Sequence, residues 1–128
     1  MTARFSRPAA ALVFAAALTL GTAAFAHHGW EWAEEKQSTL EGTIREIYIG
    51  PPHPTLKVET AKDGLWQIDL ANPSQTSRSG FTEGSAQPGH KILILGNRSA
   101  RKDQKLMKAV KITVEGKDFL LYPERIPK

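Results

Sequence analysis

Three of the chain's four histidines have the chemistry and the setting of metal ligands. His27 and His28 are adjacent near the N-terminus, and His53 stands within the proline-rich stretch Pro51-Pro52-His53-Pro54. Neutral imidazole binds Cu, Zn and Ni well, and copper(II) binds most tightly in the common order of divalent metals. The flanking prolines reduce the conformational entropy that His53 loses when it is held in place. We therefore predict a metal site, with copper as the expected ion, formed by His27, His28 and His53.

The chemistry of His27 depends on the segment before it. Residues 1–26 have the pattern of a secretory signal, with an early pair of arginines, an apolar run over 9–20 and the cleavage motif Ala24-Phe25-Ala26. The run is shorter than the roughly 20 residues of a spanning helix, so we predict cleavage and a periplasmic or secreted protein without membrane attachment. Cleavage after Ala26 would give His27 a free α-amine that binds an ion together with its ring. Cleavage after Ala24 would place His27 third, which favours square-planar Cu(II) or Ni(II).

Composition limits the remaining possibilities. Removing residues 1–26 leaves 102 residues, enough for one hydrophobic core but not for two. The absence of cysteine excludes a disulfide, a thiolate metal site and lipid attachment through an N-terminal Cys. Two arginines leave with the signal, so the formal charge falls from +4 to +2 with both signs interspersed, and we expect no nucleic-acid partner. One basic cluster is interpreted as a solvated hairpin: Arg98, Arg101, Lys102, Lys105 and Lys108.

No catalytic motif stands out in the chain. It has no serine nucleophile motif, no glycine-rich phosphate loop and no HExxH pair. Asp69 is a lone acid beside apolar positions, which by itself is not a mechanism, and His90 after Pro88-Gly89 is expected to be a turn residue. Glu31 is predicted to orient a metal-bound histidine through its carboxylate. We expect a binding protein rather than an enzyme.

Apolar spacing predicts strands over most of the chain after residue 38. Residues 39–49 change their apolar phase near Arg45-Glu46, which predicts a bulge that lets one strand serve two partners. Residues 55–60 and 65–70 are predicted to form a hairpin through an Asp-Gly turn. A short helix is predicted to begin after the N-cap and proline pair Asn72-Pro73 and to end near Gly80. Further strands are predicted at 91–95, 106–114 and 118–122.

This order of elements fits an all-β fold: a five- to six-stranded OB-like barrel with one short helix between strands three and four. The run Ile92-Leu93-Ile94-Leu95 suggests a strand covered on both faces, and the polar stretch 96–104 suggests a hairpin tip. We assign residues 27–38 to an N-terminal arm, 39–123 to the barrel and 124–128 to a tail.

A series of short motifs follows in order along the mature chain: Ala26-His27-His28, Gly42-Thr43-Ile44, Pro52-His53, Trp66, Asn72-Pro73, Gly80-Phe81-Thr82, Pro88-Gly89 and Ala109-Val110-Lys111. Their order resembles a family of small exported bacterial proteins that is classed as a domain of unknown function. The chain departs from that family's pattern where Pro51-Pro52 replaces Asn-Pro, Phe81 replaces Trp and His90 replaces Asp. The resemblance implies an OB-like barrel and export, it implies no established activity, and it includes the same three N-terminal and loop histidines.

Two other functions stay open on the sequence. In the first, the barrel is an interaction module whose face with Trp66 and Phe81 binds a periplasmic protein, a peptide or a glycan without metal, which rests on analogy between OB-like folds. In the second, the N-terminal histidine site is the centre of a copper oxidase or monooxygenase, although the pattern indicates no substrate cleft.

Overall fold

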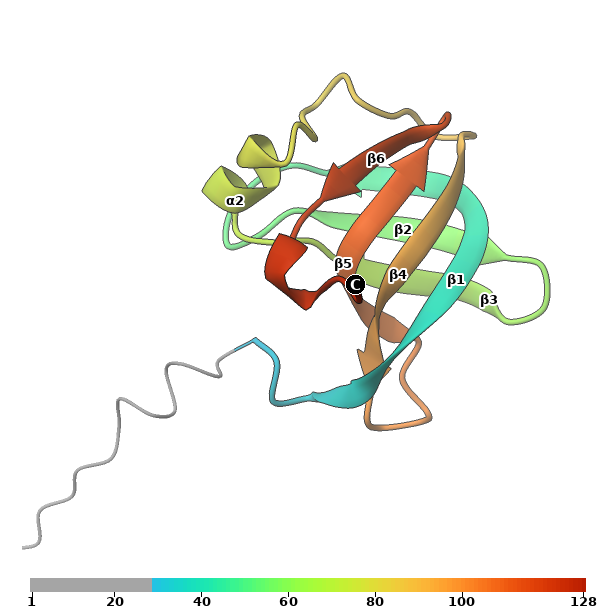
Figure 1. Cartoon of the computed structure of the whole chain (residues 1–128). Helices are drawn as coiled ribbons and strands as arrows, with labels where there is room; N and C mark the ends of the chain where they lie inside the picture. Colours follow the sequence, from blue (N-terminus) through green and yellow to red (C-terminus); the bar gives the residue numbers. More distant parts are fainter. Residues whose placement is uncertain (1–28) are drawn as a thin grey trace, which may run out of the picture.

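The computed structural model describes residues 29–128, which form a six-stranded sheet with two short helical segments (Figure 1). Neighbouring strands pair in the order β3-β2-β1-β4-β5-β6, and β3 also pairs in parallel with β5. Five strands therefore close a ring of hydrogen bonds, as expected for an OB-like fold, and the predicted all-β class with its single short α-helix is confirmed. The elements are β1 (Ala33–Tyr48), β2 (Thr55–Thr60), β3 (Gly64–Asp69), α2 (Pro73–Arg78), β4 (Lys91–Ser99), β5 (Leu106–Val114), β6 (Lys117–Leu120) and the 3-10 helix η1 (Pro123–Arg125).

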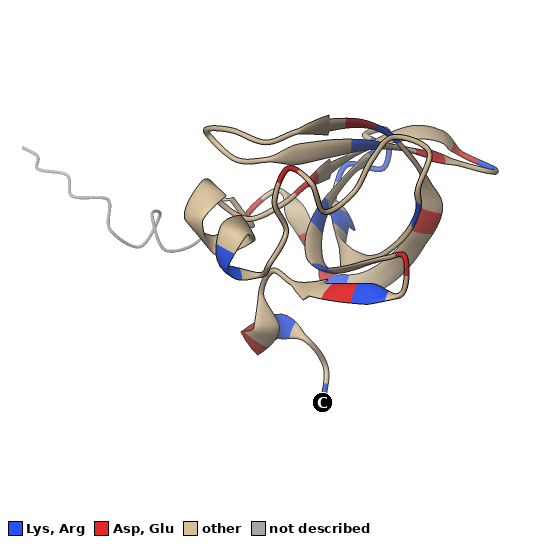
Figure 2. Cartoon of the chain, turned by 90° about the horizontal axis from the view of Figure 1, so that it is seen from above, with Lys and Arg blue, Asp and Glu red and all other residues tan. Residues whose placement is uncertain are grey.

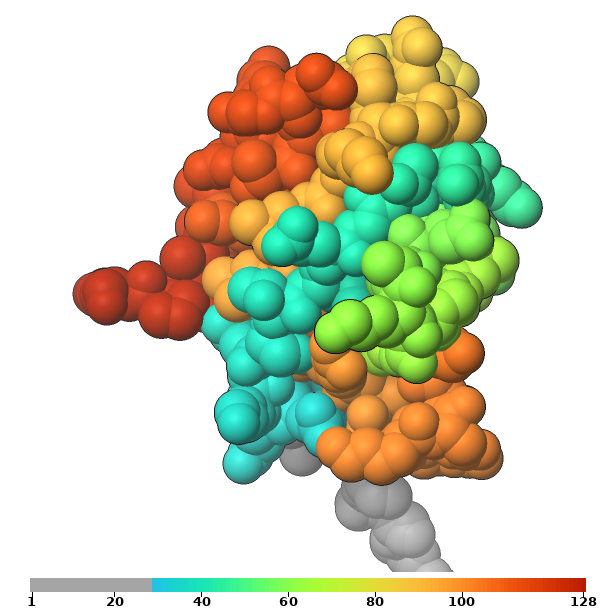
Figure 3. All heavy atoms as spheres, turned by 90° about the vertical axis from the view of Figure 1, so that its right-hand side faces the viewer, coloured from blue at the N-terminus to red at the C-terminus, as the bar shows by residue number. Residues whose placement is uncertain are grey.

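The longest strand, β1, belongs to both halves of the ring. It pairs first with β4 and then with β2, and its register with β2 shifts between Ile44 and Glu46, which confirms the predicted bulge. In Figure 3, β1 crosses the face diagonally, with the β2–β3 hairpin on one side and β4 on the other. The strand begins at Ala33, so residues 33–38, predicted to lie in the arm, belong to the sheet.

Residues 33–38 belong to β1 without apolar alternation, and their backbone is partly held by a side chain. The register between β1 and β4 is irregular within this stretch. The buried amide of Asn97 donates from Nδ2 to the carbonyl oxygens of Glu34, at 2.9 Å, and of Glu35, at 3.1 Å. A side-chain amide thus takes the place of ladder bonds, and strand periodicity does not reveal such a replacement.

The hairpin of β2 and β3 and the helix after it have the predicted local chemistry. Gly64 follows the tight turn with a φ of +77°, a conformation that glycine adopts without strain. The Oδ1 atom of Asn72 accepts a hydrogen bond from the Gln75 N–H at 2.8 Å and caps α2. Gly80, with a φ of +98°, follows the helix end. The hairpin and the helix predictions are confirmed.

Trp66 and Phe81 lie inside the fold rather than on a surface that a partner could contact. They are 4% and 1% exposed. Trp66 lies on the inner face of β3, and Phe81 packs edge-on against Phe119 with the ring centroids 5.2 Å apart. The prediction that these two residues form a partner-binding face is wrong, because a domain of this size uses its large aromatic side chains to fill the core.

Strand β4 differs from its prediction in two respects. Leu93 is 42% exposed while both of its neighbours are buried, so cover on both faces is wrong and one face of the strand meets solvent. The strand also continues through Gly96 to Ser99, where a hairpin tip was predicted. A Cβ atom on Gly96 would lie 2.2 Å from the carbonyl oxygen of Lys108. This glycine therefore permits the close approach of two strands and does not form a turn.

Charged side chains are distributed over the whole fold. Figure 2 shows basic and acidic residues interspersed along the described chain rather than gathered by sign. Neither helical segment between residues 29 and 128 has the length and the apolar character needed to cross a bilayer.

Candidate functional site

His53 lies in the loop that joins β1 to β2, with its ring partly exposed. Its Nδ1 atom is 3.4 Å from the carbonyl oxygen of Pro54, which also accepts a hydrogen bond from the Leu70 N–H at 3.0 Å. A carbonyl oxygen only accepts, so Nδ1 is the donor in this contact and Nε2 of the neutral ring carries a lone pair. Nε2 lies 3.9 Å from Oδ2 of Asp69. Two electron-rich atoms thus face each other, and a cation between them would stabilise the arrangement.

Asp69 is the last residue of β3, and its side chain is 11% exposed. Its Oδ1 atom accepts a hydrogen bond from Gln67 Nε2 at 2.9 Å, and Gln67 Oε1 accepts one from Lys57 Nζ at 3.3 Å. Oδ1 is therefore occupied while Oδ2 faces His53. Zinc bonds to nitrogen and to oxygen are each about 2.0–2.2 Å long, so two such bonds together exceed the distance between Oδ2 and His53 Nε2. One ion between Oδ2 and the His53 ring could bind both.

A buried lysine completes this arrangement. Lys108 pairs with Asp69 across the parallel contact of β5 with β3 and is 7% exposed, so its assignment to a solvated hairpin is wrong. Its Nζ lies 3.4 Å from the Leu70 carbonyl oxygen and 5.6 and 5.7 Å from the ring centroids of Trp30 and Tyr122. Burial lowers the pKa of Lys108, and the Asp69 carboxylate opposes this effect. Burial also raises the pKa of Tyr122. We call the following residues the polar cluster: His53, Gln67, Asp69 and Lys108.

The first described residues of the chain lie against the polar cluster. A Cβ atom on Gly29 would lie 3.9 Å from Lys108 Nζ. The Trp30 ring packs edge-on against Tyr122 with the centroids 5.0 Å apart, and the Arg125 guanidinium carbon lies 3.8 Å from the Trp30 centroid. Residues 124 and 125, predicted to lie in the tail, belong to η1, and Arg125 contacts the start of the chain through Trp30. The N-terminal end of the described chain therefore lies at the polar cluster.

Of the predicted ligands, His53 alone falls within the structure that is described. His27 and His28 lie outside the described residues, directly before the first of them. Glu31 is exposed in the turn before β1, and the carboxylate beside His53 is that of Asp69. In the described part of the chain, no three His, Cys, Asp or Glu side chains gather in a way that could hold a metal ion. This part contributes a pair of possible ligands, one imidazole and one carboxylate.

Asp69 and Lys108 were not predicted as site residues, although each leaves a local signal in the sequence. Both are charged residues inside apolar runs, Ile68-Asp69-Leu70-Ala71 and Met107-Lys108-Ala109-Val110, and charged residues are seldom fully buried unless they are paired. What no local pattern supplies is the partner. The two residues meet only because β3 and β5 close the ring.

His90, the fourth histidine, is a turn residue, as predicted. Its Nδ1 atom accepts a hydrogen bond from the Gln87 N–H at 3.1 Å, so the neutral ring carries its proton on Nε2. That nitrogen lies 3.7 Å from Oε1 of Glu115, a residue whose side chain is 65% exposed. Nδ1 of His90 is thus engaged by the backbone, and Nε2 faces an exposed carboxylate.

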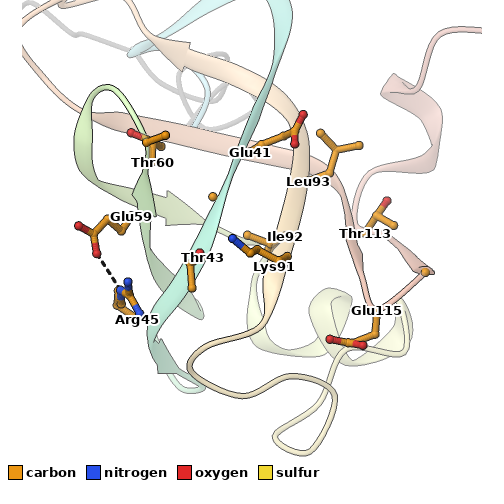
Figure 4. A pocket seen from close by; sticks show the side chains of 13 residues that line it. Glu41, Thr43, Arg45, Glu59, Thr60, Lys91, Ile92, Leu93, Thr113 and Glu115 are labelled. Atoms are coloured by element: carbon orange, nitrogen blue, oxygen red, sulfur yellow. Dashed lines mark hydrogen bonds and ion pairs between the residues drawn. The ribbon is translucent and has the colours of Figure 1, made fainter.

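A broad groove of about 940 Å³ crosses the outer face of the ring over β1 and β4 (Figure 4). Arg45 and Glu59 form an ion pair at its edge, with Nε and Oε1 2.8 Å apart, and both side chains are half exposed. Lys91 and Glu115 lie on other parts of its wall. Charges of both signs face solvent here without converging on one point, so the groove defines no particular ligand.

Fold and cluster together define a small OB-like domain that presents a histidine–carboxylate pair beside its own N-terminal segment. Residues 15–107 match the model of DUF6152, a family of unknown function. The match spans more than half of the chain, so the chain belongs to this family, and the resemblance drawn from the motif order is confirmed. The matched region includes all of β1 to β4 and ends one residue before Lys108. A search of curated proteins finds no match.

Proposed function

We propose that this protein is an exported, non-catalytic metal-binding protein whose ion is copper(II). In this proposal His27 binds through its α-amine and its ring, and His53 binds through Nε2. Asp69 supplies an oxygen, and His28 can replace the ring of His27. The observation that carries the proposal is that the described chain begins at the polar cluster, beside the residues that face His53.

A chain of contacts links the start of the described chain to His53. Gly29 lies beside Lys108, whose strand partner Asp69 faces His53. Paired strands lie about 4.8 Å apart, and two residues of chain span at most about 7 Å. The proposal therefore requires the segment before Gly29 to extend along the polar cluster toward the His53 ring.

The donor set favours copper among the common divalent ions. One amine nitrogen, two imidazole nitrogens and one carboxylate oxygen suit Cu, Zn and Ni, and copper(II) has the highest affinity in that order. A metal-binding histidine usually donates its other ring N–H to a carbonyl or a carboxylate, which fixes the orientation of the ring. The contact of His53 Nδ1 with the Pro54 carbonyl has this form and leaves Nε2 for the ion.

Export supplies the free amine that the proposal needs. The signal pattern of residues 1–26 places cleavage after Ala26, and the pKa of a free α-amino group lies close enough to neutral pH for a metal ion to displace its proton. The protein would then act in the periplasm or outside the cell. The intact mass of the exported protein tests this step, and a mass that begins at a residue other than His27 contradicts it.

The proposal is tested by titrating the processed protein with Cu(II) in competition with a chromophoric chelator. We expect His53→Ala to weaken binding by about 100-fold or more, because losing a ligand costs at least as much as losing the group that orients it. Acetylation of the α-amine should have a comparable effect. His90→Ala is the matched control and should leave affinity unchanged. Affinity that survives both His53→Ala and acetylation rules the site out.

A further inference from the structure

We infer that Trp30, Tyr122 and Arg125 form a clasp that positions the mature N-terminus for the metal site. The inference rests on the proposed function and deepens it by naming the residues that hold the amine-bearing segment. Tyr122 and Arg125 belong to the C-terminal part of the chain, in and beside η1, whereas Trp30 directly precedes β1. The clasp thus joins the two ends of the domain.

The C-terminal half of the clasp is fixed to the barrel. The N–H groups of Leu121 and Tyr122 both donate to the Val110 carbonyl oxygen, at 2.9 and 3.0 Å. Leu121 is fully buried, and its carbonyl oxygen accepts a hydrogen bond from Gln75 Nε2 at 2.8 Å. Arg125 N–H donates to the Tyr122 carbonyl at 2.9 Å. These hydrogen bonds fix the position of η1, against which Trp30 packs.

The N-terminal half is held through one indole ring. Arg125 stacks on Trp30 with its guanidinium carbon 3.8 Å from the ring centroid, and Tyr122 meets the same ring edge-on at 5.0 Å. Gln37, on β1, donates from Nε2 to the Arg125 carbonyl at 2.8 Å and ties the support to the strand that follows Trp30. Cation–π and aromatic contacts of this kind are specific in geometry and individually modest.

The clasp affects the metal site because it fixes the chain close to His27. Without it, the nearest fixed residue would be Trp32, whose carbonyl oxygen accepts a hydrogen bond from the Ala100 N–H at 2.8 Å, five residues from His27. With it, the nearest fixed residue is Trp30, three residues from His27. Shortening a tether that must close on a second site from five residues to three favours closure by about twofold. The contacts of Trp30 also direct the chain toward Lys108, next to Gly29, and so toward the polar cluster.

The test uses the processed full-length protein with four variants: Trp30→Ala, Trp30→Phe, Arg125→Ala and the control Arg78→Ala. Arg78 is an exposed arginine in the last turn of α2, the other short helix. Amide exchange of Ala33, whose N–H donates to the Trp30 carbonyl at 3.0 Å, reports docking without metal. Competition titration and the Cu(II) electron paramagnetic resonance spectrum report the site.

We expect Trp30→Ala to speed exchange at Ala33 and to weaken Cu(II) binding by about threefold to tenfold. Trp30→Phe should restore most of the affinity and the wild-type spectrum, Arg125→Ala should weaken binding by about threefold, and Arg78→Ala should change neither readout. Faster exchange with unchanged affinity and spectrum, in Trp30→Ala or in Arg125→Ala, would make the clasp merely structural and overturn the inference. If the wild-type protein binds no copper, the proposed function itself is overturned. If the wild-type protein binds copper and the variants bind it equally well, only the clasp is overturned.

Discussion

The protein contains two histidine–carboxylate pairs of nearly equal separation, and they differ in almost every other respect. His53 Nε2 lies 3.9 Å from Asp69, and His90 Nε2 lies 3.7 Å from Glu115. The two imidazoles are about equally exposed, at 33% and 34%, whereas the carboxylates are 11% and 65% exposed. Distance and ring exposure therefore do not separate a candidate ligand from a turn residue here. The partners of the two rings do.

The difference lies in the tautomer that each neighbourhood selects. At His53 a carbonyl oxygen faces Nδ1, so the nitrogen beside the carboxylate is unprotonated in the neutral ring. At His90 a backbone N–H donates to Nδ1, so the nitrogen that faces Glu115 carries the proton. The first pair becomes favourable when a proton or a metal ion lies between its two atoms, whereas the second pair already has a proton there. This contrast teaches that backbone contacts of a ring indicate its function better than its charged neighbour does.

The largest expected effect concerns the buried lysine that supports the first pair. In metal-free protein, Lys108→Met should lower the free energy of unfolding by about 3 kcal/mol, because it removes the charged hydrogen bond to the buried Leu70 carbonyl and the nearby positive charge that offsets the Asp69 carboxylate. Lys91→Met, on the exposed groove, is the matched control and should change it by less than about 0.5 kcal/mol. Urea denaturation followed by tryptophan fluorescence measures both variants.

A double variant shows whether Asp69 is the reason. Adding Asp69→Asn to Lys108→Met should recover part of the lost stability, since the uncompensated charge is then gone. If the two effects simply add, Lys108 stabilises the fold through packing against Trp30 and Tyr122, and the electrostatic account of the polar cluster is wrong.

The next effect separates the two carboxylates directly. Asp69→Asn should weaken Cu(II) binding by about 10- to 100-fold, the usual cost of losing a group that binds or orients a metal-bound histidine. Glu115→Gln, at a similar distance from its own histidine, should leave the affinity within about twofold of wild type, because His90 lies outside the proposed site. Chelator competition measures both. Equal losses in the two variants would mean that overall charge, not the polar cluster, governs binding.

The sequence predicts well those features that depend on neighbouring residues. The Asn72 cap, the turn before β3 and the bulge after Ile44 all follow from local chemistry, and all are present. His53 could likewise be proposed as a ligand from its residue type and its prolines alone. Each of these predictions needs only a few consecutive positions.

The sequence predicts poorly those features that depend on closing the ring. Asp69 and Lys108 meet through the parallel pairing of β3 with β5, and Trp30 meets Arg125 across nearly the whole chain. Burial also assigns Trp66 to the core rather than to a surface. Local spacing does not contain these contacts, because each one joins segments that are distant in sequence and become neighbours only after the ring of strands closes.

The smallest expected effect comes from a third carboxylate, which extends the comparison to a solvent-exposed pair. Lys102 donates a hydrogen bond to Glu34 and is 82% exposed; this bond lowers the pKa of Glu34 below its ordinary value of 4.5. A lowered pKa in the folded state stabilises the protein above pH 4.5, and this contribution is lost as pH falls through the lowered value. Lys102→Ala should therefore lower Tm slightly at neutral pH and not at all near pH 2. Calorimetry over this pH range measures the change in Tm. A large decrease in Tm that persists in acid would show that the Lys102–Glu34 pair acts by packing. It would also remove the distinction between buried and exposed carboxylates.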